Sequence, residues 1–239
     1  MKATIPRHPL DAIDDRPRSE ATRAVAAAWI AFMAGLMVGG ELTGPVSVAI
    51  AGVSGAALVF VGFAAAWRSR TLHRSASVNR LRQTLLALAV GGTLGLCNLA
   101  ANWTIAAADP RIRAVLVERM ATLGPLEALI ASPIVEEVAV RLFLMSAMAW
   151  VMLRITKRTG VAFAIALIGS ALVFALLHLG RPFPGDPVLA NYYRAALLTK
   201  YTLAGMPLGW IFWRWGLPYA IVAHAAGNAA HLALQDALF

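Results

Sequence analysis

The amino-acid sequence predicts an all-α protein, a polytopic transmembrane bundle of about seven helices. Hydrophobic residues make up 59% of the 239 residues and charged residues only 14%, compared with about 25% charged residues in soluble domains. The apolar residues gather in runs of roughly 20, and an α-helix of that length crosses about 30 Å of hydrocarbon. We expect the spans, in chain order, at Ala24–Gly40, Val46–Trp67, Leu85–Ala108, Pro125–Leu153, Val161–Leu179, Ala195–Trp213 and Leu217–Leu234.

The first 23 residues are predicted to form a polar, disordered tail. They contain five basic residues, four acidic residues and three prolines, a composition that buries too little apolar surface to fold. The apolar run that follows lacks a clear small-x-small cleavage site, so we do not expect a removable signal peptide. Residues 24–239 are predicted to form a single transmembrane bundle.

Two of the apolar runs and two of the segments that connect them are ambiguous. Ala24–Gly40 is short, and Ala195–Trp213 contains Lys200 and a proline. Six or eight spans are therefore open alternatives to seven. The segments Pro110–Arg119 and Val188–Lys200 fit either loops or segments that lie at the membrane surface.

The basic residues flank the apolar runs and do not form one continuous stripe. A net charge of +9 would suggest nucleic-acid binding in a soluble protein, but we interpret it here as a topology signal and expect no nucleic-acid partner. With a cytoplasmic N-terminus, fourteen Lys and Arg residues lie on the cytoplasmic side, where basic residues are enriched. Arg141 alone stays within the membrane, and six basic residues lie on the opposite side: Arg111, Arg113, Arg119, Arg181, Arg194 and Lys200.

The fourth apolar run contains three charged residues, Glu136, Glu137 and Arg141. Each ionised group at the centre of a bilayer costs roughly 2.5–3.5 kcal/mol, and such groups usually face one another or a polar cavity. Residues four apart share a face of a helix, so we expect Glu137 to pair with Arg141. Glu136 then lies on another face without a basic neighbour, which suits a general base.

Polar residues recur in the fifth and seventh runs. His178 follows Phe174 by one helical turn, and Asn228 follows His224 by one turn, with His231 three residues further on. Polar side chains that face lipid are costly, so we expect these faces to turn inward. Each feature also has a structural interpretation: a buried ion pair for the fourth run, an interfacial His178, and Asn228 as interhelical contact. We interpret His231 as structural or incidental.

Three motifs in this order resemble the CPBP intramembrane proteases, which include the type II CAAX prenyl endopeptidases and the Abi group. The family pattern Glu-Glu-x-x-x-Arg resembles 136–141, Phe-x-x-x-His resembles 174–178, and His-x-x-x-Asn resembles 224–228. The resemblance implies a catalytic core at 124–234 and hydrolysis of a peptide bond within or at the edge of the membrane.

The resemblance also implies a role for each motif residue. Glu136 and His178 would bind and deprotonate water, and His224 and Asn228 would donate to the oxyanion of the tetrahedral intermediate. Phe174 would be a supporting residue. The remaining pair, Glu137 and Arg141, would hold the helix in register. Because Arg141 pairs with Glu137, the carboxylate of Glu136 would have no countercharge.

Other chemistries remain open at this stage. Ser132 and Ser170 lie one or two turns from the candidate residues on their own helices, so the spacing permits a serine nucleophile. We expect no cofactor, but Glu136, His178 and His224 form a two-histidine, one-carboxylate set that suits zinc. The single cysteine, Cys97, rules out an intramolecular disulfide and a Cys-based metal site.

The sequence therefore predicts an intramembrane endopeptidase, a hydrolase that cleaves a membrane-delivered peptide or C-terminal segment. Its expected partners are a peptide or protein substrate in the membrane and the lipid bilayer. We expect an integral protein of the bacterial inner (plasma) membrane with a cytoplasmic N-terminus. Two alternatives are a non-catalytic membrane peptide-binding or immunity protein of the same fold and a proton-coupled transporter.

Overall fold

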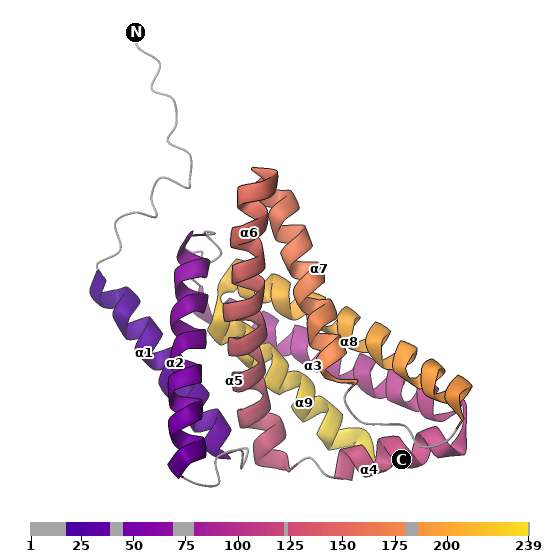
Figure 1. The fold of residues 1–239 in the computed structure, drawn as a ribbon. Coiled ribbons are helices and arrows are strands. Elements are labelled where there is room, and N and C mark those ends of the chain that lie inside the picture. The colour runs from indigo at the N-terminus through magenta and orange to yellow at the C-terminus, as the bar shows by residue number, and fades with distance from the viewer. Residues whose placement is uncertain (1–17, 39–44, 69–78, 122–123, 180–185, 239) are drawn as a thin grey trace.

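The computed structural model describes residues 18–38, 45–68, 79–121, 124–179 and 186–238, and within these ranges every regular element is a helix (Figure 1). The predicted all-α fold is confirmed. The elements in chain order are α1 (Arg18–Val38), α2 (Pro45–Arg68), α3 (Arg80–Ala106), α4 (Pro110–Ala121), η2 (Glu127–Ala131), α5 (Ser132–Glu136), η3 (Glu137–Met145), α6 (Ser146–Thr156), α7 (Thr159–Leu177), α8 (Pro187–Trp215) and α9 (Leu217–Leu238).

Each predicted apolar run coincides with a helix or with a continuous group of helical segments. Within the described residues, length and apolar composition qualify three stretches as membrane-crossing: Arg80–Ala106, Glu127–Thr156 and Thr159–Leu177. Val25–Leu36 and Ile50–Ala66 are shorter apolar helices. The helices α8 and α9 have the length but carry polar side chains along it. The count of seven spans therefore stays a prediction.

The structure resolves both connecting segments whose conformation the sequence left open. Residues 110–119 lie in α4, and residues 188–200 are the first half of α8. Both helices begin with an Asp-Pro pair, Asp109-Pro110 and Asp186-Pro187. Each aspartate accepts a hydrogen bond from the backbone N–H two residues on, at 2.7 and 2.8 Å, and proline suits the first position of a helix.

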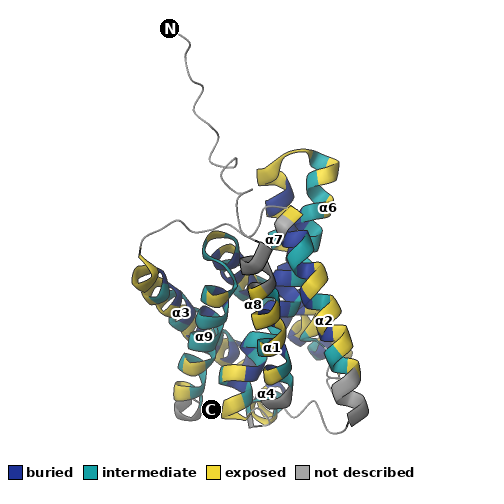
Figure 2. Ribbon diagram, turned by 90° about the vertical axis from the view of Figure 1, so that its left-hand side faces the viewer, coloured by how far each residue is buried: buried dark blue, intermediate teal, exposed yellow. Residues whose placement is uncertain are grey.

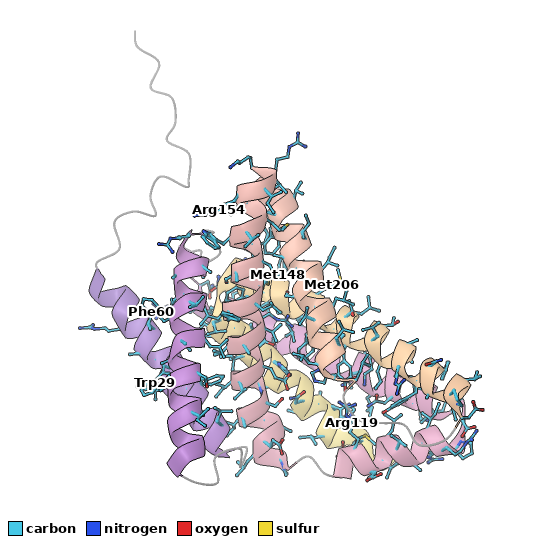
Figure 3. The ribbon with its side chains drawn as sticks, in the orientation of Figure 1. Trp29, Phe60, Arg119, Met148, Arg154 and Met206 are labelled. Atoms are coloured by element: carbon cyan, nitrogen blue, oxygen red, sulfur yellow. The ribbon has the colours of Figure 1, made fainter. Side chains whose placement is uncertain are left out.

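The long helical stretch η2–α5–η3–α6 lies in the middle of the bundle (Figure 1). The helices α1 and α2 pack on one side of it, whereas α7, α8 and α9 pack on the other, with α3 against α9. Buried residues gather where the helices meet, and exposed residues lie on the outward surfaces (Figure 2). Among the exposed apolar side chains are Trp29 on α1 and Phe60 on α2 (Figure 3), as expected for surfaces that face lipid.

The contact between α3 and α9 depends on glycines that let the two backbones approach closely. A Cβ atom added at Gly91 would lie 2.0 Å from the carbonyl oxygen of Ala223, and one at Gly95 would lie 2.2 Å from that of Gly227. Small residues at this four-residue spacing are typical of closely packed membrane helices. This contact fixes the position of α9, which carries His224 and Asn228.

Gly91→Ala is therefore expected to destabilise the protein by about 1–3 kcal/mol, because the added methyl group forces α9 away from α3. Gly92→Ala is the matched control, since a Cβ at that position meets nothing within 4 Å. Thermal unfolding in detergent should show a lower Tm for the first variant and an unchanged or slightly higher Tm for the second. Equal Tm values for the two variants would contradict the close packing of α3 on α9.

Candidate functional site

A cavity of about 220 Å³ opens between α3, α4, α7, α8, α9 and the η2–α5 segment. Its lining includes all four residues for which the sequence suggested a direct chemical role: Glu136, His178, His224 and Asn228. These side chains come from three separate parts of the chain. The fold therefore brings them to one space, as the sequence analysis expected.

Glu137 and Arg141 form the predicted pair, and both side chains are fully buried. The Nε atom of Arg141 lies 3.2 Å from Oε2 of Glu137, and the guanidinium carbon lies 5.3 Å from the centre of the Phe174 ring. The other carboxylate oxygen of Glu137 lies 2.9 Å from Nδ1 of His224. Glu137 thus ties the central helix to α9 and orients the imidazole of His224.

Glu136 has a different environment from its neighbour. Its side chain is 27% exposed, and among the described residues no Lys or Arg lies within ion-pair distance of its carboxylate. Ser132 Oγ donates a hydrogen bond of 2.6 Å to Oε1, and Nε2 of His224 lies 3.7 Å from Oε2. One glutamate is therefore neutralised by a buried guanidinium, while the other faces the cavity.

The two histidines are held in the same way. Nδ1 of His178 lies 2.8 Å from the carbonyl oxygen of Phe174, one turn earlier in α7. Because a carbonyl oxygen only accepts, Nδ1 carries the proton and Nε2 keeps a lone pair. The same reasoning assigns a proton to Nδ1 of His224, which faces the ionised Glu137. The Phe174 ring separates the imidazoles, at centroid distances of 4.4 and 6.4 Å.

Asn228 contacts the central helix at the point where the backbone hydrogen bonds of that helix change from the π-helical to the α-helical pattern. In η2 the backbone N–H of Ser132 donates to the carbonyl of Glu127, five residues back. The next donor in this π-helical pattern would be Pro133, which has no N–H, so the carbonyl of Ala128 needs another donor. Asn228 Nδ2 supplies it at 2.7 Å. One amide N–H of Asn228 is thereby engaged, and the second remains for the oxyanion role that the resemblance implies.

One part of the site, around Lys200 and Arg119, was not predicted from the sequence. Lys200 and Arg119, which the charge pattern assigned to the side of the membrane opposite the cytoplasm, both line the cavity. Lys200 is buried and donates a hydrogen bond of 2.6 Å to Oδ1 of Asn102. Arg119 donates to the carbonyl of His178 at 3.3 Å. It lies at the end of the bundle opposite Arg154 (Figure 3). The missed signal was a polar residue within an apolar run, at position 102 as well as at position 200.

The candidate residues of the two alternative chemistries have different surroundings. Within the part of the chain that the structure describes, no group of three or more His, Cys, Asp or Glu residues is arranged to hold a metal ion. Zinc at Glu136, His178 and His224 stays an untested alternative. Ser170 is buried and donates to the carbonyl of Leu167 at 3.2 Å, away from the cavity lining. Ser132 lines the cavity and touches Glu136. His231 also lines it.

About half of the chain is similar to a known protein family. Residues 119–230 match the model described as Rce1-like, Type II CAAX prenyl endopeptidase Rce1-like. This range includes all three motifs and every lining residue with a predicted role. Neither the curated proteins nor the solved structures contain a match.

Proposed function

We propose that this integral membrane protein is an intramembrane endopeptidase that uses a glutamate-activated water. The match of residues 119–230 to the Rce1-like family of type II CAAX prenyl endopeptidases, a protease family, supports this proposal. The substrate is a membrane-delivered peptide or C-terminal segment. One observation carries the proposal: Glu136, without a cationic Lys or Arg partner among the described residues, faces the same cavity as His178 and His224.

In the proposed reaction, a water molecule binds between Glu136 and Nε2 of His178. Glu136 takes a proton as the water oxygen forms a bond to the scissile carbonyl carbon, and the carbonyl π electrons move to its oxygen. When the carbonyl re-forms, the C–N bond breaks and the leaving amine takes the proton from Glu136. General base catalysis of this kind contributes typically 10²–10⁴-fold.

His224 and Asn228 are proposed to stabilise the oxyanion. His224 already donates through Nδ1 to Glu137, so donation through Nε2 requires the doubly protonated imidazolium. The carboxylate of Glu137, which accepts the hydrogen bond from Nδ1, stabilises that form. Each preorganised donor to an oxyanion contributes about 3–4 kcal/mol of transition-state stabilisation.

We propose that the site lies toward the outer half of the membrane. Arg158 precedes α7 and His178 ends it, so the cavity and the basic turn between α6 and α7 lie at opposite ends of that helix. Basic residues favour the cytoplasmic side. We therefore propose a cytoplasmic N-terminus, a bacterial inner membrane and a substrate that reaches the cavity from the outer half.

A cleavage assay tests the proposed function. Purified protein in detergent is incubated with synthetic peptides that match C-terminal membrane segments, with and without EDTA, and the products are identified by mass spectrometry. Cleavage that is unaffected by EDTA supports the proposal. Binding without cleavage would instead favour a peptide-binding protein, and proton-driven flux in proteoliposomes without proteolysis would favour a transporter.

Ser132→Ala distinguishes water from serine as the nucleophile. We expect a fall in kcat of about tenfold or less, because the variant loses a single hydrogen bond to Glu136. A serine nucleophile would instead make the loss far larger, about 10³-fold or more. The measurement is kcat on a cleaved peptide, with Ser170→Ala as the matched control away from the cavity.

A further inference from the structure

The imidazole of His178 contacts two aromatic rings. The ring of Phe174, one turn earlier on α7, has its centre 4.4 Å from the centre of the imidazole, and the ring of Tyr201 on α8 has its centre 4.3 Å away. The Phe174 and Tyr201 rings meet edge to face, with centres 6.2 Å apart. An aromatic pair at such distances contributes about 0.5–1.5 kcal/mol beyond the area that it buries. The two rings therefore restrict the orientation of the imidazole.

The hydrogen bond of His178 does not by itself fix the ring. Nδ1 lies 2.8 Å from the carbonyl oxygen of Phe174, and the imidazole can still tilt about this bond. The Tyr201 ring lies at 32° to the plane of the imidazole and covers one of its faces, which blocks that movement. Both residues line the cavity together with Glu136. The position of Nε2, the atom proposed to bind water, thus depends on Tyr201.

Two cations hold the Tyr201 ring in turn. Nζ of Lys200 lies 4.3 Å from the centre of the ring, and the guanidinium carbon of Arg119 on α4 lies 5.7 Å from it. Both distances are within the roughly 6 Å of a cation–π contact. Lys200 is anchored to Asn102 on α3 by a hydrogen bond of 2.6 Å, and Arg119 donates to the carbonyl oxygen of His178 at 3.3 Å. The ring is therefore fixed from α3, α4 and α8 against the end of α7.

We propose that Tyr201 is a positioning residue for His178, whose imidazole it holds in the orientation that presents Nε2 to the attacking water. This inference rests on the proposed function and adds to the site a residue outside the three motifs. The contact is made by the aromatic ring, so the ring and not the hydroxyl group carries the role. A displacement of a reacting group by about 1 Å can cost about 10²-fold in rate.

The kinetic test compares two substitutions of this tyrosine. Tyr201→Leu is expected to lower kcat by about 10–100-fold and to change KM by less than about threefold, because the imidazole acts on the water and not on the peptide. Tyr201→Phe keeps the ring and should stay within about threefold of the wild-type kcat. Tyr193→Leu removes a buried ring of α8 that does not line the cavity. This matched control should have the wild-type kcat per folded protein even where its Tm falls.

A measurement without substrate reports on the contact itself. Nuclear magnetic resonance of protein labelled at its five histidines detects the imidazole Hε1 protons, and the signal that is lost in His178→Gln belongs to His178. An aromatic ring shifts the signals of protons beside it. Tyr201→Leu should therefore move the His178 signal, whereas Tyr201→Phe and Tyr193→Leu should leave it in place.

The two measurements together separate this proposal from the proposed function. Wild-type kcat in Tyr201→Leu, or a His178 signal that this substitution does not move, overturns the positioning role and leaves the protease proposal intact. An equal loss of kcat in Tyr201→Phe also overturns it, since the hydroxyl group would then be the active part. If wild-type protein cleaves no peptide, the proposed function fails, and a His178 signal that moves in Tyr201→Leu but not in Tyr201→Phe still supports the positioning of the imidazole. If Tyr201→Leu does not fold, Tyr201→Met replaces it, because a thioether fills irregular space without a ring.

Discussion

Glu136→Gln is expected to abolish peptide cleavage and to leave the fold intact. The glutamine side chain has nearly the same shape and still accepts the hydrogen bond from Ser132, but its amide cannot take a proton from water. Loss of a general base lowers kcat by about 10²–10⁴-fold. The rate of product formation under saturating peptide measures the effect, and thermal unfolding in detergent verifies that the variant folds.

Glu127→Gln provides the matched control for this experiment. Glu127 lies nine residues earlier on the same central helix and does not line the cavity. Its variant should cleave at the wild-type rate. Full activity in Glu136→Gln would remove the proposed mechanism, whatever the control shows.

Arg141→Ala is expected to cause the largest loss of stability, about 3–5 kcal/mol, because it leaves the buried carboxylate of Glu137 without its guanidinium partner. The lost side chain also packs against the Phe174 ring, so a void adds to the effect. His224 would remain as the described partner of Glu137. The imidazole would then have to compensate that charge, and its orientation toward Glu136 should change.

Arg154→Ala is the control for this prediction. Arg154 is exposed near the end of α6 and stacks on Trp150, with its guanidinium carbon 4.2 Å from the ring centre (Figure 3). Its removal should cost less than about 1 kcal/mol. The Tm of the two variants in detergent compares them directly, and a Tm for Arg141→Ala as high as that of Arg154→Ala would show that the buried pair does not stabilise the fold.

The sequence predicted the helices well where apolar composition determines them. Every predicted run coincides with a helical stretch, because an unbroken apolar segment of this length has few other stable conformations. The two segments left open, 110–119 and 188–200, are helical despite their charges. Their Asp-Pro starts were readable signals. The π-helical turns of η2 and η3 were not predicted, and Asn228 on α9 hydrogen-bonds the backbone of η2.

The part of the candidate site that depends on spacing within one helix could be predicted from the sequence. A four-residue separation placed Glu137 opposite Arg141 and left Glu136 apart, and the structure has this arrangement. The position of Lys200 in the lining of the cavity was not predicted, because this residue was interpreted only as a topology signal. Its burial beside Asn102 results from the packing of α8 on α3. Polar residues within the apolar runs mark both partners of this contact, but the local sequence does not specify which two helices meet.

The central claim is that water, activated by Glu136, attacks the peptide bond directly. Intact-protein mass spectrometry of an acid-quenched single-turnover reaction tests it, with wild-type protein in excess over a cleaved peptide. We predict that product accumulates while the protein keeps its unmodified mass at every time point. A transient protein species heavier by the mass of the acyl fragment, and absent in Ser132→Ala, would contradict the claim and identify a serine nucleophile.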